Sequence, residues 1–111
     1  MKNDTFTLIN YSSIKGYEGN TEDLKTGEFE YHFGTIKRYK NKQVETNENG
    51  DSIVFDLAWI SKNEYVIINL GKQIYGMNDT LIIKITNNTP DYYECYKKYG
   101  KYAEYQMVIK R

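Results

Sequence analysis

Apolar and polar residues alternate along this chain from Gly27 to its end. The clearest stretch is Ser52 to Ile60. One side of it carries Ile53, Phe55, Leu57 and Trp59, and the other carries Val54, Asp56 and Ala58. Because successive side chains of a β-strand point to opposite faces, this period of two predicts a half-buried strand.

The same period predicts further strands over residues 28–33, 35–39, 43–46, 65–70 and 80–86, and a first strand over residues 5–9. Asn49-Gly50, within a polar run ending at Asp51, is typical of a hairpin turn, because these residues accept the positive φ values that such a turn needs. The piece between Gly71 and Gly76 gives no clear pattern.

The last twenty residues allow two interpretations. Thr89-Pro90 resembles a helix start, which would place Tyr92, Tyr96, Tyr99 and Ala103 on one helical face. Against a helix, Gly100 would fall in its middle, and the closing Gln-Met-Val-Ile favours a strand. We therefore expect two strands, over residues 92–99 and 101–109, hinged at Gly100.

Residues 10–27 are polar and rich in Gly, Ser and Asn. They predict a loop, so that residues 1–27 form a loose N-terminal arm, with a partly helical piece at residues 22–25. After Gly34 the connections are short, so neighbouring strands should pair in space. At 111 residues we expect one all-β domain, an antiparallel up-and-down meander that closes into a small barrel or a strongly curved sheet.

Charge and cysteine content narrow the function classes. Fifteen basic residues balance fifteen acidic ones, which gives no general case for nucleic acid or an anionic membrane as partner. The chain holds one cysteine, Cys95, so neither an internal disulfide nor a multi-cysteine metal site is expected. No run of 18 apolar residues predicts a transmembrane helix, and the first residues lack the apolar core of a signal peptide.

Several segments carry a resemblance. They are Leu24-Lys25-Thr26-Gly27-Glu28-Phe29-Glu30-Tyr31, Thr35-Ile36-Lys37-Arg38, Gln43-Val44-Glu45-Thr46, Leu57-Ala58-Trp59-Ile60-Ser61-Lys62-Asn63-Glu64-Tyr65, Ile83-Lys84-Ile85-Thr86 before Asp91-Tyr92-Tyr93, and Met107-Val108-Ile109-Lys110. Over residues 22–111 the chain resembles small uncharacterised lipoprotein-like proteins of Bacteroidetes-type bacteria. The resemblance implies a lipocalin-like β-barrel and transfers no catalytic residue.

The family leader ends in a lipid-bearing cysteine, whereas residues 1–23 contain none. The resemblance therefore implies an exported protein, periplasmic or lipid-anchored, if a natural leader was removed, and the chain is otherwise expected in the cytoplasm. Some related chains carry a topoisomerase label. Nothing in this sequence supports it, because a phosphate-binding loop is missing.

Candidate chemistry centres on three residues. His32 shares a predicted strand face with Glu28 and Glu30, which suits proton transfer, although a solvated outer face explains the same pattern. Asp56 either lines the barrel interior, pairs with Arg38 or a lysine, or points outward. Trp59 either stacks on a ligand or, as we expect, is mostly buried among Phe29 or Phe33, Phe55 and Leu57.

These candidates are weak. Cys95 lies far in sequence from the only histidine, so a small core residue is favoured over a nucleophile. The tyrosine- and lysine-rich residues 92–102 suit stacking on single-stranded nucleic acid, but two ordinary strands produce the same string. No metal and no cofactor is expected.

The sequence therefore favours a non-catalytic binding module that holds a small apolar ligand or docks a protein partner. One alternative is a small hydrolase or isomerase that uses His32 with a carboxylate. The other is an interaction or inhibitory protein that acts through an edge strand.

Overall fold

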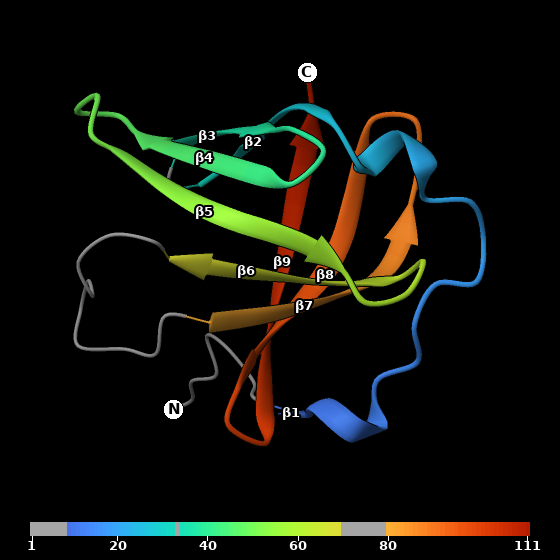
Figure 1. Cartoon of the computed structure of the whole chain (residues 1–111). Helices are drawn as coiled ribbons and strands as arrows, with labels where there is room; N and C mark the ends of the chain where they lie inside the picture. Colours follow the sequence, from blue (N-terminus) through green and yellow to red (C-terminus); the bar gives the residue numbers. More distant parts are fainter. Residues whose placement is uncertain (1–8, 33, 70–79) are drawn as a thin grey trace, which may run out of the picture.

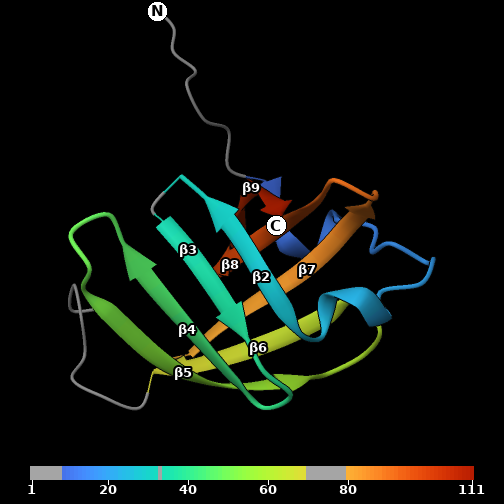
Figure 2. The same cartoon turned by 90° about the horizontal axis from the view of Figure 1, so that it is seen from above.

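Eight antiparallel strands follow one another around a closed barrel, and one short strand lies beside the ring (Figures 1 and 2). The computed structural model describes residues 9–32, 34–69 and 80–111. In chain order the elements are β1 (Ile9–Asn10), the 3-10 turns η1 (Tyr11–Ser13) and η2 (Glu22–Leu24), β2 (Gly27–Tyr31), β3 (Gly34–Arg38), β4 (Lys42–Asn47), β5 (Ser52–Trp59), β6 (Glu64–Asn69), β7 (Thr80–Asn88), β8 (Tyr92–Tyr99) and β9 (Tyr102–Lys110).

Each strand from β2 to β8 pairs with the next along the chain, and β9 closes the ring by pairing with both β8 and β2. The predicted all-β meander that closes into a barrel is therefore confirmed. β1 is the additional strand, with Ile9 opposite Ala103 and Asn10 opposite Tyr102. In Figure 1, β1 lies at the lower end of β9 and β2 at its upper end.

The core follows from the alternation in the sequence. The buried residues packed together inside the barrel are Leu24, Phe29, Ile36, Phe55, Leu57, Tyr65, Ile67, Ile83, Ile85, Tyr93, Cys95 and Val108. Burial of one large aliphatic or aromatic side chain contributes about 1.5–3 kcal/mol. Every barrel strand except β4 contributes to this cluster, so burial of the core and closure of the ring depend on each other.

The C-terminal residues form two strands, as expected, and not a helix. Tyr99 lies opposite Tyr102 across a turn in which Gly100 has φ 61°, a left-handed conformation that glycine adopts without strain. The polar run before Asp51 also forms its predicted turn, closed by the Asn47 amide donating to the Asp51 carbonyl at 2.9 Å.

Some boundaries differ from the sequence prediction. The strand expected over residues 28–33 ends at Tyr31, and His32 lies in the turn that follows. β7 continues to Asn88, two residues beyond the predicted end, past an irregularity between Ile85 and Asn87. Most of the strand expected over residues 5–9, and the uncertain piece after Gly71, lie outside the described residues.

Residues 9–27, for which the sequence favoured a loose arm, pack against the barrel. Tyr11, Ile14, Thr21 and Leu24 are buried. This segment contacts the barrel through a few separate buried residues. Such residues produce no periodic pattern in the sequence from which the packing could be predicted. The expected helical piece is the 3-10 turn η2. Within the described part of the chain, no helix has the length and apolar character needed to cross a membrane.

Candidate functional site

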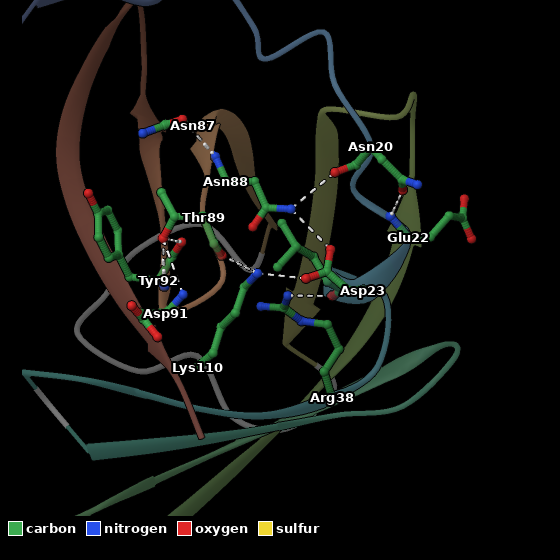
Figure 3. A network of polar contacts seen from close by, with 11 residues as sticks. Asn20, Glu22, Asp23, Arg38, Asn87, Asn88, Thr89, Asp91, Tyr92 and Lys110 are labelled. Carbon is green, nitrogen blue, oxygen red and sulfur yellow. Dashed lines mark hydrogen bonds and ion pairs between the residues drawn. The ribbon is translucent and has the colours of Figure 1, made fainter.

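One end of the barrel is covered by η2 and the residue before it, which contact the β5–β6 turn and the ends of β7 and β9; Figure 3 shows Asp23 between Asn88 and Lys110. Asp23 accepts a hydrogen bond from the Lys110 ammonium at 2.6 Å and another from Asn88 Nδ2 at 3.0 Å. Asn88 Nδ2 also lies 3.0 Å from the Asn20 carbonyl, and the Thr21 hydroxyl donates to the Lys62 carbonyl in the β5–β6 turn. These polar contacts hold the N-terminal segment across the end of the barrel.

Beneath η2, the guanidinium of Arg38 is buried inside the barrel. Its Nε donates to Gln43 Oε1 at 2.8 Å, and its Nη1 donates to the Leu24 carbonyl at 2.8 Å. Its Nη2 donates to the hydroxyls of Tyr65, at 3.1 Å, and Tyr93, at 2.9 Å. Side chain and backbone acceptors thus replace water around a buried charge.

Aromatic rings surround the same cation. The guanidinium carbon lies 4.6 Å from the ring centre of Phe29, 4.7 Å from that of Tyr65 and 5.7 Å from that of Tyr93. At these distances each ring attracts the cation. Burial raises the pKa of both tyrosine hydroxyls, which therefore remain neutral donors and acceptors. This cluster occupies space that an internal ligand would need at this end.

The two polar candidate residues, His32 and Asp56, lie far apart in the structure. His32 is exposed in the turn between β2 and β3, with its ring edge-on to Tyr31 at 5.7 Å. Asp56 lies on the outer face of β5, opposite Lys42, whose ammonium is 3.4 Å away. Lys42 follows the turn at the far end of β3, so the length of that strand separates the two sites. Asp56 therefore points outward and pairs with a lysine across the sheet, which combines two of the sequence alternatives.

Trp59 lies on the same face of β5 as Phe55 and Leu57, but it is half-buried rather than mostly buried. Its ring packs at 4.9 Å on Tyr65, and the Lys25 ammonium lies 5.8 Å from the indole. Because Trp59 ends its strand beside η2, only part of the indole is covered. The Nε1 is buried without a hydrogen-bond partner among the described residues.

Cys95 is a core residue, as expected. It is 1% exposed, and burial raises the pKa of its thiol to about 12 although Arg38 acts in the opposite direction. A protonated, inaccessible thiol is a poor nucleophile. Within the described ranges, no group of three or more His, Cys, Asp or Glu side chains is arranged to hold a metal ion.

The outer face of β9 is apolar and exposed. Of the eight large apolar side chains that are exposed in the described part of the chain, four belong to this strand: Tyr105, Met107 and Ile109, which alternate on the outer face, and Tyr102, which belongs to the other alternating set. Tyr105 also packs edge-on against Tyr96 of β8 at 5.6 Å, and its hydroxyl donates to Glu94. Exposed apolar side chains that share one strand make this face a candidate interaction surface.

Part of the backbone edge of the same strand has no pairing strand among residues 9–32, 34–69 and 80–111. The Lys110 amide donates to Asp91 before β8, whereas the Arg111 amide donates to Glu28 beside β2. Even-numbered residues of β9 therefore face β8, and odd-numbered residues face the opposite side. On that side β1 is opposite Ala103 and β2 is opposite Ile109.

Tyr105 and Met107 lie between those two pairings. No described strand pairs with their outward N–H and C=O groups. Both side chains are also exposed, at 46% and 45%. Among the described residues, this stretch of backbone thus has no strand partner and lies beside exposed apolar side chains. We call Tyr105, Met107 and the residues between and beside them, 104–108, the β9 edge.

The sequence analysis missed this edge and the buried arginine. The alternation of residues 101–109 indicated a strand, but register decides which part lacks a neighbour. For Arg38 a signal was present, because it shares the two-residue period with buried Ile36. Comparisons with family models, curated proteins and solved structures found no match to this chain.

Proposed function

We propose that this chain is a non-catalytic interaction module that docks an extended segment of a partner protein along the β9 edge. The observation that carries the proposal is that Tyr105 and Met107 combine exposed apolar side chains with backbone groups that no described strand pairs with. A strand added there gains main-chain hydrogen bonds and covers apolar surface in one step.

Docking on the outside is favoured over an internal apolar ligand because Arg38 and its aromatic neighbours fill the barrel beneath η2. It is favoured over hydrolase or isomerase chemistry because His32 and Asp56 lie apart on exposed parts of the chain. A ligand role for Trp59, the lipocalin-like relationship, bacterial origin and an exported location stay predictions from the sequence.

Selection from a displayed library of random twelve-residue peptides tests the proposal. The immobilised full chain should enrich peptides that bind Met107→Ala with at most a few-fold loss. The same peptides should bind Met107→Pro at least about tenfold more weakly, because proline removes an N–H of the edge. That N–H faces away from β8, so the substitution leaves the β8–β9 hydrogen bonds in place.

Circular dichroism establishes that each variant is folded. If Met107→Pro does not fold, Met107→Lys replaces it, since a lysine on an edge strand opposes strand addition while it keeps the amide. Ile60→Ala, which truncates an exposed apolar residue outside β9, is the matched control and should bind as the unmodified chain does. Failure to enrich any peptide, or equal binding to the edge variants, overturns the proposal.

A further inference from the structure

The buried cluster around Arg38 contains more hydrogen-bond donors than acceptors. A guanidinium carries five N–H hydrogens and no acceptor. Gln43 Oε1, the Leu24 carbonyl and the hydroxyls of Tyr65 and Tyr93 each accept one of them. The second hydrogen of Nη1 therefore has no acceptor among the described residues. The two hydroxyls lie 3.2 Å apart, so one donates to the other, and the hydrogen of the second also lacks a described acceptor.

The same cluster holds a positive charge that no neighbouring carboxylate balances. Arg38 is 2% exposed, and none of the ion pairs between described residues involves it. The carboxylate of Glu45 is linked to it only through Gln43, whose Nε2 donates to Glu45 at 2.8 Å. Burial of a charge without a paired charge is costly. An anion at the free donors would supply both the missing acceptor and the missing charge.

Leu24 of η2 marks the place at which an anion would meet these donors. Its carbonyl accepts from Nη1 of Arg38 at 2.8 Å, and this is the nitrogen with the unmatched hydrogen. Its side chain is 0% exposed and packs in the core. η2 thus presents one oxygen and one branched apolar chain to the cluster. An alkyl carboxylate has the same two parts, and it adds a second oxygen and a negative charge.

Room for such a ligand arises when η2 moves away from the barrel, because Leu24 occupies the position beside the guanidinium. The polar contacts of η2 are near the surface. Asp23, which is bound to Lys110 and Asn88, has a side chain that is 56% exposed. Water replaces contacts of this kind at little cost. The main loss on opening is therefore burial of the Leu24 side chain, which the alkyl chain of the ligand restores.

We propose that the end of the barrel beneath η2 is a binding site for a small alkyl carboxylate, which takes the place of Leu24 and accepts hydrogen bonds from Arg38 Nη1 and from the free hydroxyl of the Tyr65–Tyr93 pair. The site lies inside the barrel, so the inference goes beyond docking at the β9 edge and does not depend on it. A neutral apolar ligand does not fit this site, because it leaves the donors unsatisfied.

Titration of the full chain with 4-methylpentanoate, whose branched chain resembles that of leucine, tests the proposal in a buffer free of other carboxylates. The NMR signal of the Arg38 Nε–H group should shift saturably, with exposed Arg111 as the internal reference. The matched amide, 4-methylpentanamide, has the same shape without the charge and should bind at least about tenfold more weakly. Acetate, which leaves the space of the Leu24 side chain empty, should also bind at least about tenfold more weakly.

Two variants with matched exposed positions test the role of η2. Asp23→Ala removes the contacts with Lys110 and Asn88 but none in the Arg38 cluster, so it should raise the affinity for 4-methylpentanoate several-fold by making the open form more frequent. Glu48→Ala removes an exposed carboxylate from the β4–β5 turn, away from η2, and should bind as the unmodified chain does.

The outcomes separate the parts of the proposal. Absence of a saturable shift in both the unmodified chain and Asp23→Ala overturns it, as does equal affinity for the amide. Equal affinity for acetate would show that the site holds a free small anion, and would overturn the alkyl carboxylate. Arg38→Met should abolish binding, with circular dichroism to establish that it is folded. If this variant does not fold, the Arg38 signal and the amide comparison in the unmodified chain decide.

Discussion

Arg38 Nη2 donates a 2.9 Å hydrogen bond to the hydroxyl of Tyr93, which joins β3 to β8 across the barrel between residues 55 positions apart in sequence. The same guanidinium holds Leu24 of η2 through its carbonyl. One buried side chain thus connects the N-terminal segment, the first strands and the last hairpin. The barrel depends on a polar centre as well as on its apolar core.

Replacement of this centre should be costly. Arg38→Ala leaves buried acceptors on Gln43, Leu24 and the two tyrosines without their donor, and each such loss costs about 1–3 kcal/mol. We expect the free energy of unfolding to fall by about 3 kcal/mol or more. Lys37→Ala, at the exposed neighbouring position, should change it by about 0.5 kcal/mol or less. Urea denaturation measures both, and a loss below 1 kcal/mol for Arg38→Ala would contradict the role of the cluster.

Trp59 should contribute to stability as a partly buried residue. Trp59→Ala removes the contact with Tyr65 at 4.9 Å. Large aromatics in cores cost about 3–5 kcal/mol on truncation, and half-burial of this indole lowers the expectation to about 2–3 kcal/mol. A thermal melt should show a clear decrease in Tm, with Ile60→Ala as the exposed neighbour for comparison. An unchanged Tm would instead indicate that the indole serves binding and not packing.

The ion pair at the closed end predicts a dependence of stability on pH. Desolvation raises the pKa of the Asp23 carboxyl, but hydrogen bonds from Lys110 and Asn88 outweigh it, and the pKa lies below its ordinary value near 4. A depressed pKa in the folded state stabilises the protein above the ordinary value, and this contribution is lost as the pH falls through the folded-state pKa.

The difference in unfolding free energy between the unmodified chain and Asp23→Asn should therefore be largest above pH 5 and should shrink toward pH 3. Because Asp23 is largely exposed, solvent screening keeps the effect small. Denaturation series at several pH values provide the measurement. A difference that is constant over this range would show that Lys110 does not interact with the Asp23 charge.

Cys95 should react only after the protein unfolds. The thiol is 1% exposed and its pKa is raised to about 12 by burial, so little thiolate exists at neutral pH. Addition of a chromogenic disulfide reagent should give negligible reaction in native buffer and one equivalent of thiol in denaturant. Rapid reaction of the folded chain would contradict burial of this residue.

The period of two predicted most of the fold, because it reports directly which side chains of a strand are buried. It located β5 to within one residue and β8 without error. The sequence favoured a loose N-terminal arm because the segment is polar and its buried residues, such as Tyr11 and Leu24, are isolated among polar neighbours. Isolated buried residues produce no periodic pattern. Tertiary contacts of this kind emerge only when the barrel exists.

The candidate site was harder to predict for a related reason. Alternation shows that Tyr105 and Met107 share a face, but only the register of the described strands shows that their outward backbone groups lie between the pairings of β9 with β1 and with β2. His32 attracted attention as the only histidine, a property of composition that carries no information about position. The two-residue spacing between Arg38 and Ile36 predicts that both side chains are buried. Arginine is, however, usually exposed in proteins, which favoured a surface position.

Hydrogen exchange of the β9 amides, followed by NMR on the full chain, tests the central claim most directly. The amides of Tyr105 and Met107 should exchange orders of magnitude faster than those of Glu104, Gln106 and Val108, whose N–H groups face β8. Addition of an edge-binding peptide should slow the first two amides and leave the other three unchanged. Equal protection of all five amides in the free protein would show that the edge is already covered, and would contradict the account.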